Sequence, residues 1–270
     1  MPQIAHLIRS YKASRLFLDL RPVSRSNYTG VLNKLEHALG PTTNLQAITR
    51  SSIERMLAAQ SPGAVANALK KWRILARFAI SHGWLTVDPS FGIKRPKPTD
   101  GHHCWTDAEL THFRLYWPIG TRQRTAFELV IQTGQRVSDV YRMTHADVSG
   151  DLLYVRQSKT GRTLHLPLSP TLVAMLPFGA LCPTTRGTGF KSAASFGMWF
   201  NRAIRASGLP ARCTAHGLRK ARCRQLAEAG CSALEVASIS GHATLTEVQR
   251  YCAAVDQQRL ARAALQRLAG

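Results

Sequence analysis

Acidic side chains are scarce in this sequence of 270 residues. Asp and Glu number 15 against 36 Lys and Arg, which gives a formal net charge of +21. The excess is spread along the chain, because residues 1–95 carry 14 basic and 4 acidic side chains and residues 96–270 carry 22 and 11. Both halves are therefore expected to contact a polyanion, and this charge favours DNA or RNA as the partner over a basic protein with no nucleic-acid role.

Cysteine pairs and long apolar runs are also missing. The cysteines contain no Cys-x-x-Cys pair, so we expect free thiols in a reducing cytosol at Cys104, Cys182, Cys213, Cys223, Cys231 and Cys252. Neither a secretory signal nor a membrane-spanning run is found, which predicts a cytoplasmic protein with no membrane partner. His102, His103 and Cys104 are adjacent, but no partner cluster accompanies them, and an exposed linker is favoured there over a metal site.

Helical spacing of apolar residues predicts that residues 1–95 form a small helical bundle. The expected helices are one containing Leu16, Phe17 and Leu20 that ends near Pro22, one over residues 27–39, one opened by a capping box at Ser51-x-x-Glu54, and one over residues 62–82. On the last of these helices, Trp72 and Phe78 are expected in the core. Its basic side chains are the candidates for contact with DNA phosphates, namely Lys70, Lys71, Arg73 and Arg77.

A segment rich in Pro, Gly and charge, FGIKRPKPTDGHH, predicts a linker at residues 96–104 before a second domain at residues 105–270. Thr106-x-x-Glu109 predicts a capping box that opens this domain. Alternating residues from Asp151 to Ser169 predict a hairpin that turns at Lys159-Thr160-Gly161. Helices are expected near residues 122–132, 170–177, 191–207, 216–229 and 256–268, with capping boxes at Ser232 and Thr244. The expected fold class is mostly α with a small antiparallel sheet.

Several short segments of the second domain carry groups suited to phosphate chemistry. In chain order they hold Arg136 after a Gly turn, Lys159 at the hairpin tip, His216-x-x-Arg219 on one helix face, Gly241-His242, and Tyr251 nine residues after that His. Each alone has an ordinary structural role, such as a solvated charge or a half-buried packing Tyr. Together they suit phosphoryl transfer without a metal: the Arg pair neutralises non-bridging oxygens, Tyr attacks phosphorus, and His and Lys move protons.

This ordered set resembles the signature of the tyrosine recombinase, or phage integrase, family. The resemblance covers roughly residues 105–270, whereas the N-terminal bundle is similar to the family's core-binding domain only in size and helicity. It implies a catalytic α+β domain in which Tyr251 forms a 3′-phosphotyrosine with DNA, needing no ATP, metal or other cofactor. The remaining roles that it implies are phosphate binding by Arg136, Arg219 and His242, proton transfer to the leaving 5′-oxygen by Lys159, and assistance to Tyr251 by His216.

The sequence departs from common family forms at Gln135, where an apolar residue is frequent, at His145, where Trp is common, and at Cys252. The implied partners are double-stranded recombination sites in the nucleoid, a homotetramer on synapsed DNA, and an accessory excision or bending factor. Two alternatives stay open. One is an enzyme that acts as a monomer on a single duplex, like a type IB topoisomerase, which would not need the C-terminal helix to dock on a neighbour. The other is a non-catalytic DNA-binding regulator, which would be expected to lose some of the catalytic groups.

Overall fold

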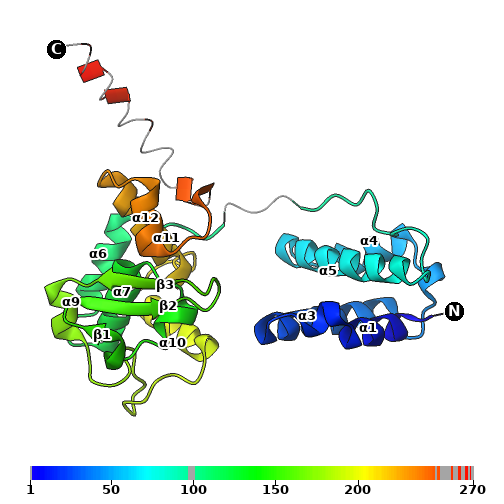
Figure 1. Cartoon of the computed structure of the whole chain (residues 1–270), viewed down its shortest axis with the longest axis horizontal. Coiled ribbons are helices and arrows are strands. Elements are labelled where there is room, and N and C mark those ends of the chain that lie inside the picture. The colour runs from blue at the N-terminus through cyan, green and yellow to red at the C-terminus, as the bar shows by residue number, and fades with distance from the viewer. Residues whose placement is uncertain are drawn as a thin grey trace. The chain divides into compact units, whose positions relative to one another are not determined.

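The computed structural model describes residues 2–96, 101–246 and 248–249, and further on only residues 257, 261–262, 265–266 and 268. The chain forms two compact units, residues 1–101 and 102–270, so their boundary falls inside the expected linker. Tyr251, Cys252 and most of the helix expected over residues 256–268 lie outside the described residues. Figure 1 shows the helical first unit and the second unit, in which helices pack behind and beside a small sheet.

The first unit consists of helices packed around one apolar core. They are α1 (Ile4–Ala13), α2 (Arg15–Leu18), α3 (Pro22–Leu39), the 3₁₀ turn η1 (Leu45–Ala47), α4 (Arg50–Ala58) and α5 (Pro62–Ser81). Leu7, Leu32, Leu69 and Trp72 are fully buried in this core. The expected bundle is therefore present, and α5 has the bounds that the apolar spacing predicts to within one residue.

Two local expectations in the first unit were wrong. Pro22 does not end a helix but occupies the first turn of α3, where a missing N–H costs nothing because no helical carbonyl lies before it. The capping box of α4 is formed by Thr49 and Ser52, with the Ser52 N–H donating to Thr49 Oγ1 at 3.3 Å. Glu54 pairs instead with Arg50, one helical turn before it, at 2.8 Å.

The second unit has a small sheet and a larger set of helices. Its elements are α6 (Asp107–Tyr116), α7 (Arg122–Thr133), α8 (Val137–Val140), η2 (His145–Asp147), β1 (Val148–Ser149), β2 (Leu152–Arg156), β3 (Thr163–Pro167), α9 (Pro170–Met175), α10 (Ala193–Ala206), α11 (Ala215–Glu228) and α12 (Ala233–Ser240). The strands pair antiparallel in the order β1-β2-β3. The expected fold class, mostly α with a small antiparallel sheet, is confirmed.

The predicted alternation along the hairpin is present. Leu153, Val155 and Leu166 turn toward the core, whereas Tyr154 and His165 pair across the outer face with ring centroids 4.4 Å apart. Alternation of this kind places one face of a sheet against helices and leaves the other in water. The sheet thus fixes the loop between β2 and β3, residues 157–162, at one end of the hairpin.

Close packing around Trp105 joins the start of the second unit to the first turn of α11. Trp105 is fully buried and its Nε1 donates to the Thr214 carbonyl oxygen at 3.0 Å. A Cβ on Gly217 would lie 2.7 Å from Trp105 Cδ1 and 2.2 Å from the His103 carbonyl oxygen. Only glycine therefore allows the first turn of α11 to approach the segment that enters the unit.

The capping boxes predicted at the starts of α6 and α12 are confirmed. The Thr106 N–H donates to Glu109 Oε2 at 2.8 Å, and the Ser232 N–H donates to Glu235 Oε2 at 2.6 Å. Both acidic side chains satisfy N–H groups that the helix itself leaves unpaired. Among the described residues, no helix is long and apolar enough to cross a membrane.

Candidate active site

The turn between α7 and α8 brings Arg136 to the site. Gly134 ends α7 with φ +62°, a left-handed conformation that glycine adopts without strain, and Arg136 is the N-cap residue of α8. The Gly134 carbonyl oxygen accepts a hydrogen bond from Arg219 at 2.7 Å. The turn that presents the first arginine is therefore tied directly to the second.

Arg219 lies on α11 and is 3% exposed. Its NH1 donates to the carbonyl oxygens of Gly134 and Ser240, at 2.7 and 2.8 Å. Its NH2 lies 3.2 Å from Nε2 of His242. A buried guanidinium is tolerated only where its donors are paired, and these partners come from the ends of α7 and α12.

The Gly241-His242 pair, directly after α12, forms the third part of the site. Gly241 ends α12 with φ +68°, and His242 follows, almost fully buried. The pKa of His242 is lowered to about 4, first by burial and then by the positive charges of Arg219, Arg136 and Lys159. That these cationic groups act on one imidazole reflects how closely the predicted residues gather.

Lys159 lies exposed in the loop between β2 and β3. Hydrogen bonds on two sides hold this loop in place. Asp139 Oδ1 accepts hydrogen bonds from the Ser158 N–H at 2.8 Å and the Ser158 hydroxyl at 2.7 Å, which anchors the loop to α8. On the other side, Arg162 NH1 donates to the His242 carbonyl oxygen at 2.6 Å. The predicted hairpin lysine is thus carried by a loop attached to α8 and to the Gly-His segment.

His216 begins α11 next to a residue that the sequence did not single out for this site. The ring of His102 lies 4.5 Å from that of His216, centroid to centroid. The pKa of His216 is lowered to about 4, first because its ring is partly withdrawn from water and then through electrostatic interaction with His102 and Arg219. His102 is exposed, as expected, but it departs from a linker role because its ring lies beside that of the predicted catalytic His216.

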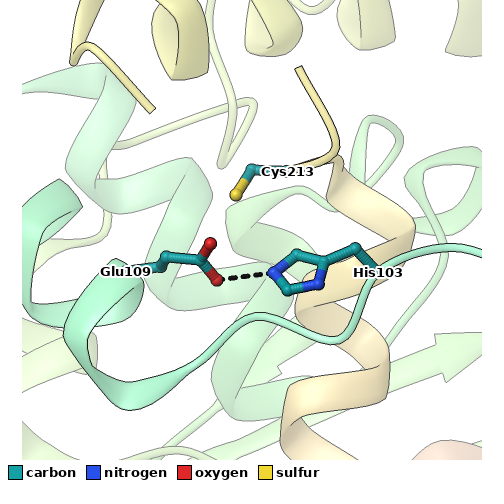
Figure 2. Close-up of side chains that lie close together, drawn as sticks. All are labelled: His103, Glu109 and Cys213. Carbon is teal, nitrogen blue, oxygen red and sulfur yellow. Dashed lines mark hydrogen bonds and ion pairs between the residues drawn. The ribbon is translucent and has the colours of Figure 1, made fainter. Parts of the chain in front are cut away.

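His103 also departs from the expected exposed linker. Figure 2 shows His103, Glu109 and Cys213 together, with His103 Nε2 2.7 Å from Glu109 Oε2. Burial opposes ionisation of Glu109, but hydrogen bonds from Thr106, His103 and Arg212 outweigh it and lower its pKa to about 2. Burial and the Glu109 carboxylate raise the pKa of the Cys213 thiol to about 11.

The donor types of this cluster would suit a metal ion, and their ligand atoms lie within 4.8 Å of one another. Arg212, however, lies 3.2 Å from Glu109 Oε1 and already supplies a positive charge. Glu109 Oε2 is hydrogen-bonded to the backbone N–H of Thr106 and to the side-chain Nε2 of His103. These contacts favour a structural role, in which Glu109 of α6 links the segment around His103 to Arg212, shortly before α11. The described cysteines, Cys104, Cys182, Cys213, Cys223 and Cys231, are all free thiols.

The basic residues predicted on α5 differ in their surroundings. Lys70 and Arg77 are exposed, and Arg73 donates to the Ile93 carbonyl oxygen at 2.7 Å. Lys71 is 5% exposed, with Nζ 3.9 Å from the centroid of the Tyr28 ring. Burial, and then the charge of Lys70, lower the pKa of Lys71. The structure therefore does not favour Lys71 as a phosphate contact, because its side chain is buried and its ammonium lies over the Tyr28 ring.

Residues 108–177 and 183–258 match the Phage integrase family. The chain belongs to this family. It is 27% identical to the integrase of Escherichia phage HK022 over 161 residues, which are 58% of this chain and 45% of that protein. It is also 25% identical to the tyrosine recombinase XerC of Proteus mirabilis over 269 residues, 90% of this chain and 87% of the relative.

Solved structures support the same fold. A lambda integrase dimer bound to a COC′ core site gives a TM-score of 0.80 at 22% identity, covering 91% of this chain and 97% of that chain. A lambda integrase tetramer bound to a Holliday junction gives 0.79 at 23% identity, with 92% and 79% covered. Against full-length phage integrases of HK022 and phage 434, however, the chain spans less than half of their length, 45% and 41%.

Proposed function

We propose that this integrase-family chain is a site-specific DNA recombinase that cleaves and rejoins DNA through a 3′-phosphotyrosine at Tyr251. The observation that carries the proposal is that Arg219 is hydrogen-bonded to Gly134, Ser240 and His242, while the charge of Arg136, in the turn after Gly134, also lowers the pKa of His242. Two guanidinium groups that meet one phosphodiester would neutralise both non-bridging oxygens, where two cations would act in a metal nuclease. The reaction would then need neither metal nor ATP.

The remaining groups supply proton transfer. The exposed ammonium of Lys159, on the β2–β3 loop, would protonate the leaving 5′-oxygen, while the neutral imidazole of His216 would accept the proton of Tyr251. His242 would bind a phosphate oxygen. The energy of the broken bond would be retained in the protein–DNA link, so a different 5′-hydroxyl could rejoin it. This order of steps accounts for all of the signature residues without a cofactor.

Double-stranded recombination sites are the proposed substrate. The proposal places the first unit on DNA through Lys70, Arg73 and Arg77, with the catalytic unit on the same duplex. A homotetramer would join two duplexes, in line with the related lambda integrase, whose structures include a tetramer on a Holliday junction. An accessory excision or bending factor is a further proposed partner.

A suicide substrate with a nick beside the cleavage site tests the nucleophile. We expect the wild-type chain to form a covalent adduct in EDTA, and Tyr251→Phe to form none while its DNA affinity is almost unchanged, because only one hydroxyl is lost. Tyr154→Phe is the matched control and should react like the wild type, since Tyr154 lies on the outer face of the sheet. Adduct formation by Tyr251→Phe would identify another nucleophile, and a requirement for a divalent ion would refute the metal-free mechanism.

A further inference from the structure

Two glutamines are buried between the candidate catalytic arginines. Gln135 and Gln157 are 0% and 1% exposed, and Gln157 Nε2 donates to Gln135 Oε1 at 2.6 Å. Gln135 uses its own Nε2 to donate to the carbonyl oxygens of Thr133 and Ile239, at 2.9 and 2.8 Å. Buried amides are costly unless their donors and acceptors are paired, and in this pair each donor has a partner.

The orientation of the Gln157 amide follows from its neighbours. Its Oε1 accepts from Arg136 NH1 at 3.4 Å and from the Thr160 hydroxyl at 2.7 Å. Because a guanidinium can only donate, the oxygen rather than the nitrogen of the amide must face Arg136. The nitrogen therefore faces Gln135 and the Ser240 carbonyl oxygen, to which it donates at 2.9 Å.

The same Ser240 carbonyl oxygen accepts from Arg219 NH1 at 2.8 Å. Gln157 thus joins Arg136 to the Ser240 carbonyl oxygen that also binds Arg219. It also contacts Thr160, the residue after Lys159. The fit is close at Gly241 as well, where an added Cβ would lie 2.3 Å from Gln157 Nε2. One amide therefore connects the three parts of the site that come from α8, from the β2–β3 loop and from the end of α12.

We propose that Gln157 is a positioning residue, held by Gln135, that sets the Arg136 guanidinium relative to Arg219 and to the loop of Lys159. The role rests on the proposed recombinase chemistry, in which both arginines must meet one phosphate. Gln157 would not itself touch DNA, because it is buried beneath the residues that do. An apolar replacement would leave Arg136 without this acceptor and the Ser240 carbonyl oxygen with one donor fewer.

The test measures covalent adduct formation by Gln157→Leu on the nicked substrate, together with DNA affinity and thermal unfolding of the full chain. We expect the cleavage rate to fall by about 10²-fold, the loss that follows when a reacting group is displaced by about 1 Å, while the Kd for DNA stays close to the wild-type value. Gln132→Leu is the matched control. Gln132 is also hydrogen-bonded in the second unit, to Glu128 and Ser169, and among the described residues it has no hydrogen bond to a candidate catalytic residue.

A double-mutant cycle separates positioning from a general effect on folding. If Gln157 acts through Arg136, then Gln157→Leu should cause little further loss in an Arg136→Ala background. Equal losses in both backgrounds, or a wild-type rate for Gln157→Leu, would overturn the proposal. Gln157→Met is measured in parallel, because its flexible side chain fills similar space if the Leu variant fails to fold. Failure of the wild-type chain to form an adduct would instead refute the proposed function.

Discussion

The Ser240 hydroxyl oxygen lies 2.6 Å from His242 Nδ1 and donates its own proton to the Val236 carbonyl oxygen, also at 2.6 Å. Since a hydroxyl has only one proton to give, it must accept the Nδ1–H of the imidazole. Nε2 then bears the lone pair that faces Arg219 NH2 at 3.2 Å. His242 is thus neutral and fixed in one tautomer, and a phosphate bound beside it would raise its pKa and favour a proton on Nε2.

The neutral state of His242 predicts how stability depends on pH. Its pKa is lowered to about 4 in the folded chain, against an ordinary value of 6.5. As the pH falls below 6.5, the unfolded chain takes up a proton that the folded chain does not accept until about pH 4, so the free energy of unfolding should decrease across this window. The contribution of His242 is at most about 3.5 kcal/mol, from about 1.4 kcal/mol per pKa unit.

Urea unfolding of the wild type and of His242→Gln at a series of pH values between 7 and about 4.5 checks this expectation. The variant should lose less stability than the wild type over that window, although His216 still contributes to the slope because its pKa is lowered in the same direction. Carboxylates such as Glu109, with a pKa of about 2, lose their contribution only at lower pH. Identical slopes for the two proteins would mean that His242 is not neutral in the folded chain.

The salt dependence of DNA binding distinguishes the lysines of α5. Lys70 is exposed and Lys71 is buried against Tyr28, although they are neighbours in the sequence. Removing a phosphate contact reduces the slope of log K against log salt by about 1, because fewer counterions are released. We therefore expect a reduced slope for Lys70→Ala and for Arg77→Ala, measured with the full chain. Lys71→Met should keep the wild-type slope, and a change there would restore Lys71 as a phosphate contact.

Much of the fold could be predicted because its signals are local. The capping box of Thr106 and Glu109 depends on residues three positions apart, and the alternation of Leu153 and Val155 directly gives the buried face of β2. Helix α1 was not predicted, although its buried residues Ile4, Leu7, Ile8 and Tyr11 have helical spacing. The sequence therefore carries the signal for α1 in its apolar spacing.

The site was predictable only for residues that form a motif. Arg136, Arg219 and His242 were predicted because their order in the chain is distinctive, and Arg219 contacts both His242 and the turn that carries Arg136. Gln157 has no such signature, since its partners Gln135 and Ser240 lie 22 and 83 residues away and any of several polar residues could satisfy them. Residues that hold a site together through long-range hydrogen bonds are recognised only once the chain is folded.

The assignment of Lys159 as the acid makes a prediction about the leaving group. An alkoxide leaves poorly, so Lys159→Ala should cleave normal DNA more slowly by roughly 10²–10⁴-fold. Replacing the bridging 5′-oxygen with sulfur gives a thiolate, which leaves without a proton. Adduct formation by Lys159→Ala should then be largely restored on sulfur-bridged DNA, as measured on matched substrates with the two linkages.

Arg136→Ala provides the contrast, because Arg136 is proposed to stabilise charge on the non-bridging oxygens, which the sulfur does not alter. Its rate should therefore stay low on the sulfur-bridged substrate. Equal rescue of both variants would show that Lys159 binds phosphate as the arginines do and is not the acid. The acid would then be sought at His216 and His242, whose pKa values of about 4 leave both neutral near pH 7, so that either would have to gain a proton when DNA binds.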